Sequence, residues 1–142
     1  MLEIILYRFE RLTPTSMKTL TNYTEKKVTA ALERHGAFYA FGREQFEKKK
    51  AANIEYVSLR VGGLICPKEN ASELLGDLDR IHTEAIAEDV EENGLKAIVL
   101  RELWNHECFY TGEIDDAWEA LKDYPGITEQ LVIDIFNKNQ GD

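Results

Sequence analysis

An amphipathic pattern in the second half of the chain constrains the fold most strongly. Apolar residues recur there at three- and four-residue spacing, and carboxylates lie on the opposite side. The apolar set is Leu74, Leu78, Ile81, His82 and Ala85, and the acidic set is Glu73, Asp77, Glu84, Glu88 and Glu91. This spacing predicts one long helix over about 71–92. Asn70, three residues before Glu73, predicts its start, and Asn93-Gly94 predicts its end.

A second helix is predicted directly after Gly94, over about 95–109. Its apolar positions are Leu95, Ile98, Val99 and Leu103. Because only a short turn separates the two helices, we expect them to form an antiparallel helical hairpin. Two shorter helices should follow, one capped by Asp115 and ended by Tyr124-Pro125-Gly126, the other capped by Thr128.

The first half of the chain carries the signals of a small antiparallel sheet. Apolar residues flank Gly62-Gly63, and paired glycines accept the positive φ angles of a tight turn. A hairpin is therefore predicted over about 56–66, and residues 2–9 are a candidate further strand. The predicted class is α+β, with this sheet packed against the helical hairpin and further short helices.

Between these strands the pattern becomes helical. Thr24 is a plausible N-cap, and Val28, Ala31 and Leu32 form an apolar stripe that stops before Gly36. We expect a helix over about 25–35. Residues 36–50 then predict a short extended piece followed by a short helix.

Length and composition indicate one ordinary globular unit. The chain has 142 residues, of which 44% are apolar, enough for a single core. We predict one globular domain over 17–142, preceded by an extension or edge strand over 1–16; Met1 and Met17 are both candidate starts. Apolar runs are far shorter than the ~20 residues that span a bilayer. We expect a cytoplasmic protein without membrane association.

Charge is distributed unevenly along the chain. Residues 1–68 hold 12 basic and 7 acidic side chains, whereas residues 69–142 hold 5 basic and 19 acidic ones, for a net charge of −9. This acidity weighs against nucleic-acid binding by the whole surface. Cys66 and Cys108 lack metal-ligand spacing, so we expect reduced structural thiols.

The densest polar cluster is RELWNHECFYTG, residues 101–112. Glu102 and His106 are four residues apart and should share a helix face, with Asn105 and Glu107 beside them. A carboxylate next to an imidazole is the minimum for acid–base catalysis. His106 extends the apolar stripe, so its ring is expected to turn toward the interior or a cleft. A purely structural histidine is the favoured interpretation.

A metal site is the other chemistry that these residues permit. His82, Glu102 and His106 together would supply three ligands. Known catalytic patterns are missing, however: HExxH would need histidine where Tyr110 stands, and no Walker loop, GxGxxG or GxSxG occurs. No cofactor is therefore predicted, and a divalent metal is the one candidate.

A basic run offers a nucleic-acid hypothesis. Arg43 and Lys48-Lys49-Lys50 accompany Phe38, Tyr39, Phe41 and Phe46, and lysines with exposed rings can bind phosphates and bases. Lysines at a helix end also favour its dipole, and phenylalanines at this spacing usually pack into a core. The structural interpretation is favoured here as well.

Three segments, GAFYAFGREQFE (36–47), LICPKEN (64–70) and RELWNHECFYTGEIDDAWEAL (101–121), carry a resemblance. The chain resembles a family of short uncharacterised proteins of phages and other mobile elements of gut bacteria. Asn105-His106-Glu107 and Tyr110-Thr111-Gly112-Glu113 match its C-terminal motif, with Glu113 where the family favours Asp. The resemblance covers about residues 17–136 and implies a bacterial cytoplasm, without implying a reaction.

These observations favour a non-enzymatic accessory protein that acts by binding another protein. The acidic side of the 71–92 helix is either a solvated face or a mimic of nucleic-acid phosphates that binds a basic partner. The first alternative is a small acid–base or metal enzyme using Glu102 and His106. The second is nucleic-acid binding through Arg43 and Lys48 to Lys50. Homo-oligomer formation stays open.

Overall fold

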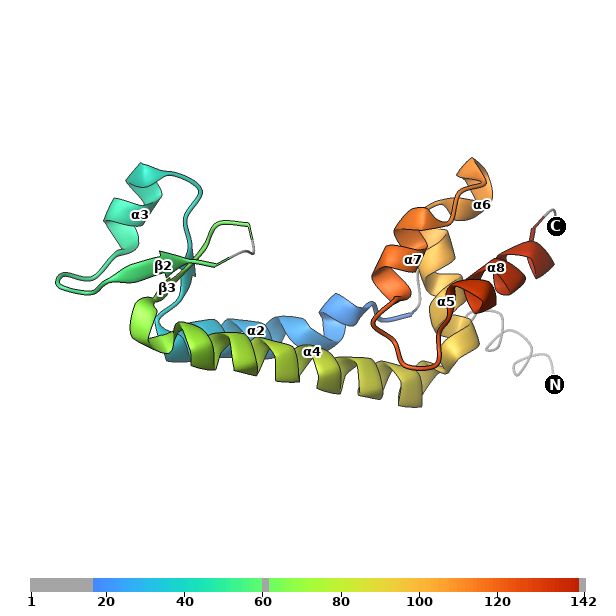
Figure 1. The fold of residues 1–142 in the computed structure, drawn as a ribbon, viewed down its shortest axis with the longest axis horizontal. Helices are drawn as coiled ribbons and strands as arrows, with labels where there is room; N and C mark the ends of the chain where they lie inside the picture. The colour runs from blue at the N-terminus through green and yellow to red at the C-terminus, as the bar shows by residue number, and fades with distance from the viewer. Residues whose placement is uncertain (1–16, 60–61, 141–142) are drawn as a thin grey trace. The chain divides into compact units, whose positions relative to one another are not determined.

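The structure, a computed structural model, describes residues 17–59 and 62–140 and confirms the predicted α+β class (Figure 1). The extension over 1–16, with its candidate strand 2–9, lies outside the described residues. The elements in chain order are α2 (Leu20–His35), β1 (Phe38–Tyr39), α3 (Arg43–Lys49), β2 (Tyr56–Ser58), β3 (Leu64–Pro67), the 3-10 helix η2 (Lys68–Asn70), α4 (Ala71–Asn93), α5 (Leu95–Asn105), α6 (Cys108–Thr111), α7 (Asp115–Leu121) and α8 (Glu129–Lys138).

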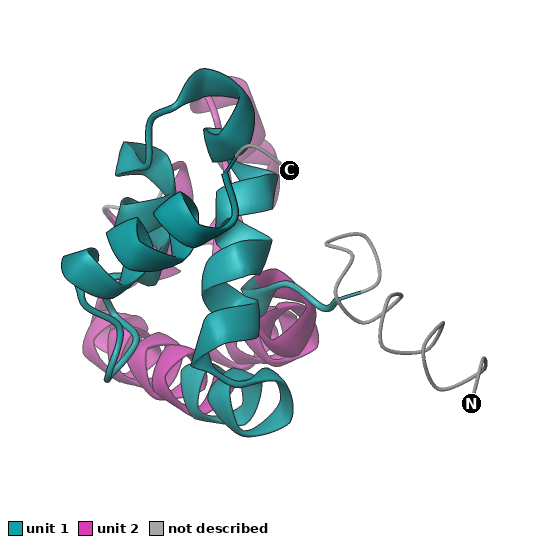
Figure 2. Ribbon diagram, turned by 90° about the vertical axis from the view of Figure 1, so that its right-hand side faces the viewer, with its two compact units in different colours: residues 1–20, 86–142 teal, residues 21–85 magenta. Residues whose placement is uncertain are grey.

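Contacts between residues divide the chain into two compact units (Figure 2). Of the described residues, 21–59 and 62–85 form the first, here called the sheet unit, and 17–20 with 86–140 form the second, the helical unit. Compact units need not fold separately. The single globular domain over 17–142 therefore stays a prediction.

The sheet unit contains a three-stranded antiparallel sheet in the order β1-β3-β2. The predicted hairpin is confirmed, with Val57 opposite Cys66. Gly63 has a φ of 78°, and a Cβ there would come within 2.7 Å of the Phe41 ring, so the turn requires glycine. The short extended piece and short helix expected over 36–50 are present as β1 and α3.

Helix α2 begins earlier than predicted. It starts at Leu20, so Thr24 lies inside the helix and is not its N-cap. The Thr24 hydroxyl donates to the backbone oxygen of Thr21 at 3.3 Å, a bond that a threonine inside a helix can form. The core of the sheet unit is formed by Ala31, Leu64, Cys66, Leu74 and Ile81.

Helix α4 matches its prediction, whereas α5 is shorter than expected. Gly94, with a φ of 79°, separates them, and α5 stops at Asn105 rather than 109. We expected α4 and α5 to pair as an antiparallel hairpin. Instead α5 makes its main contacts with α6, α7 and α8, because these helices cover its apolar stripe.

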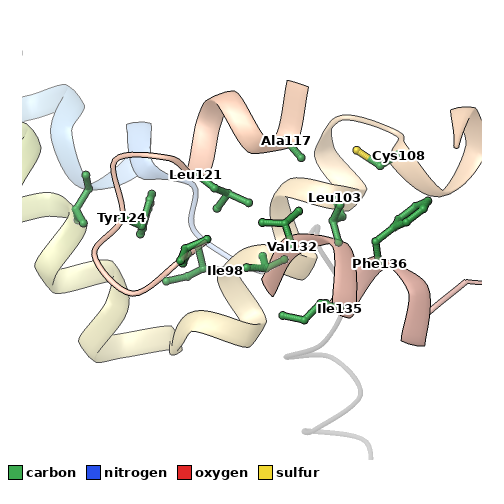
Figure 3. Close-up of a cluster of buried hydrophobic side chains, with 12 residues drawn as sticks. Ile98, Leu103, Cys108, Ala117, Leu121, Tyr124, Val132, Ile135 and Phe136 are labelled. Carbon is green, nitrogen blue, oxygen red and sulfur yellow. The ribbon is translucent and has the colours of Figure 1, made fainter. Parts of the chain in front are cut away.

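The core of the helical unit lies between α5, α7 and α8. Figure 3 shows its side chains, among them Ile98 and Leu103 of α5, Leu121 of α7, and Val132 and Phe136 of α8. With Cys108 of α6, the cluster takes side chains from all four helices described after Gly94, so the helices are held mainly by apolar burial.

The two predicted caps in this unit differ in outcome. Thr128 caps α8 as predicted, since its hydroxyl accepts from the backbone N–H of Leu131 at 3.1 Å. Asp115 is not the cap of α7; it is the first residue of the helix, and Ile114 occupies the cap position. Asp115 still favours the helix there, because a carboxylate in the first turn interacts well with the helix dipole.

Both cysteines are free, as predicted, and both are buried. Burial raises the pKa of each thiol, Cys66 in the sheet unit and Cys108 in the helical unit. Thiols in this state are poor nucleophiles. Over the described residues, no helix is both long enough and apolar enough to cross a membrane.

Candidate functional site

The predicted cluster lies where α5 ends. Glu102 and Asn105 are in its last turn, His106 follows the helix, and Glu107 links it to α6. The backbone N–H of His106 donates to the carbonyl oxygen of Glu102 at 3.0 Å. The His106 side chain keeps 35% of its surface exposed. The expectation of a ring in the interior is therefore wrong, and the alternative of a ring in a cleft stays a prediction.

Glu102 and His106 are close but do not form a hydrogen bond. Glu102 Oε1 is 3.9 Å from His106 Nε2, beyond hydrogen-bond range. Glu102 Oε2 instead accepts from Arg101 Nε at 2.9 Å and from Asn105 Nδ2 at 3.3 Å. The carboxylate is thus held by two neighbouring side chains. An acid–base role for the pair stays a prediction.

Beneath this cluster lies a buried polar network centred on Arg101. Its Nη1 and Nη2 donate to the two carboxylate oxygens of Asp89 at 2.9 and 3.0 Å. The Tyr124 hydroxyl donates to Asp89 Oδ2 at 2.6 Å, and Asn93 donates to Oδ1 at 2.8 Å. Arg101 Nη1 also donates to the backbone oxygen of Lys18 at 3.0 Å. The network ties α4, α5 and the segment after α7 together.

The network keeps its charges in spite of burial. Burial favours a neutral Asp89, but hydrogen bonds from Arg101, Tyr124 and Asn93 outweigh it and hold the pKa of Asp89 below its usual value. Burial also opposes charge on Arg101, yet its bonds to Asp89 and Glu102 raise the Arg101 pKa. Burial, with the hydrogen bond to Asp89, raises the pKa of Tyr124. The pair is therefore ionised in the folded protein, with Tyr124 as a neutral donor.

This network is not among the sites predicted above, although the sequence contains a signal for it. Asp89 continues the four-residue series of Ile81 and Ala85 on the apolar side of α4. Arg101 lies three residues after Ile98 on the apolar side of α5. A charged residue inside an apolar stripe indicates a buried partner of opposite charge. Asp89 and Arg101 are two such residues, one on each side of the turn at Gly94, and this arrangement predicts that they pair.

An aromatic surface is exposed beside the cluster. Trp104, Glu107, Phe109 and Tyr110 line one hollow, and we call these four residues the aromatic surface. Trp104 is 51% exposed and Tyr110 is 91% exposed. The ring centroids of Trp104 and Phe109 are 5.0 Å apart, and Phe109 stacks on Phe136 at 5.2 Å. The surface is thus anchored to the core of the helical unit.

Glu107 has an unusual backbone conformation within this surface. Its φ and ψ are 55° and 29°, the left-handed region, which is unfavourable for residues other than glycine and asparagine. Its backbone oxygen accepts from the N–H groups of Tyr110 and Thr111, both at 3.0 Å. This conformation ends α5 and turns the chain into α6.

Carboxylates continue from the aromatic surface along the chain. Glu113, Asp115 and Asp116 are exposed between α6 and the first turn of α7. Over the described residues, these three carboxylates and that of Glu107 form no ion pair. The only lysine or arginine in residues 101–121 is Arg101, which is buried in the network. This edge of the helical unit is therefore acidic.

The sheet unit has a polar group of its own that the sequence did not predict. Asp77 Oδ2 lies 2.7 Å from Nε2 of the buried His35 and 2.8 Å from Arg34 Nη2. Hydrogen bonds from His35 and then Arg34 lower the pKa of Asp77 to about 2. Asn70 Nδ2 donates to the His35 backbone oxygen at 3.0 Å. These bonds join the end of α2 to the start of α4, which is a structural role.

The basic run of the first half is paired within its own region. Lys48 lies 3.4 Å from Glu44, and Lys50 lies 2.8 Å from Glu47. Lys49 donates to the backbone oxygen of Tyr39 at 2.7 Å. Phe46, whose ring contacts Phe38 and Tyr56, is not free to stack on a base. Nucleic-acid binding through Arg43 and Lys48 to Lys50 is left without support from these contacts and stays a prediction.

No group of three or more His, Cys, Asp or Glu side chains suited to a metal ion is found in residues 17–59 and 62–140. His82 belongs to the sheet unit, whereas Glu102 and His106 belong to the helical unit. Their shared metal site stays a prediction.

The fold and the surface define a small α+β protein whose helical unit displays exposed aromatic residues beside exposed carboxylates. A family model described as a family of unknown function, DUF7659, matches residues 20–139. Since the match covers most of the chain, the protein belongs to this family. No curated protein and no solved structure was found to match it.

Proposed function

We propose that the protein is an accessory protein that binds another protein, and that the aromatic surface is its binding site. The observation that carries this proposal is the exposure of Trp104 and Tyr110 around one hollow. Tryptophan and tyrosine supply a large share of the binding energy at protein interfaces. The resemblance to proteins of phages and mobile elements gives the proposed setting, a bacterial cytoplasm.

The surface is well suited to binding because it is preorganised. Phe109 lies between Trp104 and the core residue Phe136, and Arg101 fixes the helix that carries Trp104. A surface that is already ordered loses less conformational entropy when a partner binds. Large exposed rings on such a support favour binding over a purely structural role.

The alternative is a small acid–base or metal enzyme built on Glu102 and His106. Their 3.9 Å separation supports it, since such pairs tighten when a substrate binds. Elemental analysis of the wild type and His106→Ala separates the two functions. We expect neither protein to carry stoichiometric metal. Metal that is present in the wild type and lost in the variant would favour the enzyme instead.

Affinity capture from cells of the source organism tests the binding proposal directly. The bait proteins are the wild type, the double variant Trp104→Ala/Tyr110→Ala, and the control Tyr39→Ala/Phe41→Ala. The control also removes two exposed, stacked rings, but from the sheet unit. We expect a partner that the wild type and the control retain and the first double variant loses. Equal capture by all three baits would contradict the proposal.

A further inference from the structure

We infer that the segment bound at the aromatic surface is basic, so that the partner inserts Lys or Arg side chains between its rings and carboxylates. This inference rests on the proposed function and specifies the partner's chemistry. It follows from three features of the aromatic surface: its exposed rings, the conformation of Glu107 and its lack of an ion-pair partner among the described residues, and the negative charge of the neighbouring residues.

The rings and Glu107 together form a site of the kind that binds a cation. An ammonium or guanidinium group over a tryptophan or tyrosine face is attracted by the ring's quadrupole. Trp104, Tyr110 and Glu107 line the same hollow, so a cation over either ring would also be near the carboxylate. An acidic or purely apolar segment would leave this carboxylate without a counterion.

Glu107 is not needed to hold the local backbone. As the residue before α6 it makes no side-chain capping hydrogen bond, and over the described residues its carboxylate has no ion-pair partner. Its left-handed φ of 55° would suit glycine better. The side chain therefore adds no capping bond or ion pair to this turn, and left-handed residues other than glycine cluster at sites that contact other molecules.

The surrounding charge selects the same partner. Glu113, Asp115 and Asp116 follow the aromatic surface, and Arg101, the only lysine or arginine in residues 101–121, is buried. A basic segment would thus meet uncompensated negative charge, which accelerates association and excludes acidic competitors.

The acidic side of α4 is the competing site for such a segment, and the aromatic surface is favoured over it. On α4, Arg80 already lies 3.3 Å from Asp77 and 4.0 Å from Glu84. Among the described residues of α4, the one exposed large hydrophobic side chain is that of Leu75, which is not aromatic. Charge alone would hold a basic segment there only weakly and with strong dependence on salt.

Binding of labelled peptides to the full chain tests the inference. The probes are a short peptide rich in Arg and Lys, its Gln counterpart without charge, and a Glu-rich counterpart, each followed by fluorescence anisotropy at physiological salt. We expect the basic peptide alone to bind. Trp104→Ala should weaken its binding roughly tenfold, as expected for a central aromatic contact.

Two glutamate variants separate the surface from general acidity. Glu107→Gly should weaken binding of the basic peptide roughly tenfold while raising thermal stability, because glycine accepts the left-handed φ. Glu88→Gln, at an exposed position on α4, should leave binding unchanged. Equal losses for both variants, or binding that survives Trp104→Ala, would overturn the inference.

The outcomes also distinguish this inference from the proposed function. If the Gln or Glu peptide binds and the basic peptide does not, the basic partner is wrong but a binding surface remains. If no peptide binds while capture from cells still depends on Trp104 and Tyr110, the partner is of another chemistry. A rise in native mass of the chain alone, lost in Glu107→Gly, would show that the segment comes from a second copy and would overturn a separate partner.

Discussion

Asp89 and Arg101 form an ion pair that is removed from water and fully hydrogen-bonded. Such a pair adds little net stability as a whole, but loss of one partner leaves a buried charge uncompensated. We expect Asp89→Asn to lower the free energy of unfolding by about 3–5 kcal/mol, measured by urea denaturation. Glu88→Gln, the exposed neighbour, is the control and should change stability little. Equal stability of both variants would contradict a buried pair.

Tyr124 contributes to the same network through its hydroxyl alone. The hydroxyl donates to Asp89 Oδ2 at 2.6 Å and accepts from Arg101 Nη2 at 3.3 Å. Tyr124→Phe keeps the ring and removes both bonds, so it should cost about 1–3 kcal/mol, less than Asp89→Asn. In the background of Asp89→Asn, Tyr124→Phe should lower the free energy of unfolding by less, because the carboxylate that accepts from the Tyr124 hydroxyl is already gone. Additive losses in this double-mutant cycle would show that the two residues act independently.

Gly76 is a glycine without a visible packing reason. It lies inside α4, and a Cβ added there would meet nothing within 4 Å. Because glycine in a helix interior is less favourable than alanine, Gly76→Ala should raise the free energy of unfolding by about 1 kcal/mol. Thermal denaturation measures the gain. A loss of stability would show that the position is crowded.

At the scale of elements, Asp77 joins the end of α2 to α4 through His35 and Arg34. The pKa of Asp77 is about 2 in the folded protein, below the ordinary value of 3.8. A depressed carboxylate pKa contributes stability above the unfolded pKa, and that stability is lost as pH falls through the folded pKa. The wild type should therefore have a higher free energy of unfolding than Asp77→Asn above about pH 4, and this difference should disappear as the pH falls to about 2.

Urea denaturation of both proteins across this pH range measures the difference. Asp79→Asn, at an exposed position on the same helix, is the control and should follow the wild type. A difference between wild type and Asp77→Asn that stays constant with pH would contradict the role of the charged carboxylate.

Elements with local signals could be predicted from the sequence. The hairpin about Gly62-Gly63, the length of α4 and the cap at Thr128 each follow from a few neighbouring residues. The early end of α5 could not be foreseen, because the residue that breaks the helix is Glu107, which carries none of the turn chemistry of glycine. The start of α2 was missed for a similar reason, since Thr24 suits a cap as well as a helix interior.

The candidate site was predicted only in part. Helical spacing within residues 101–112 indicates Glu102 and His106, whereas the exposure of Trp104 and Tyr110 follows from where α5 ends. The exposure of these rings depends on the left-handed conformation of Glu107 and on which helices cover α5. The periodicity of apolar residues gives neither. The pair of Asp89 and Arg101 is predictable only when the apolar sides of α4 and α5 are compared with each other.

At the scale of the molecule, α4 supplies side chains to both cores. Ile81 packs in the core of the sheet unit and Ile86 in that of the helical unit. We therefore expect the two units to unfold together. Leu74→Ala, in the core of the sheet unit, should lower stability by about 3 kcal/mol.

Two probes measure this coupling. Circular dichroism follows all helices, whereas tryptophan fluorescence follows the helical unit alone, because Trp104 and Trp118 are the two tryptophans of the chain. Both transitions of Leu74→Ala should shift equally. An unchanged fluorescence transition would show two units that unfold separately.

Site-specific photo-crosslinking tests the central claim, that the aromatic surface binds a partner protein. A photoreactive phenylalanine derivative replaces Tyr110, which is 91% exposed, and in a matched control it replaces the exposed Phe41 of the sheet unit. After irradiation in cells of the source organism, we predict a discrete crosslinked product from position 110 that is absent from position 41. No product from position 110, or the same product from both positions, would contradict the account.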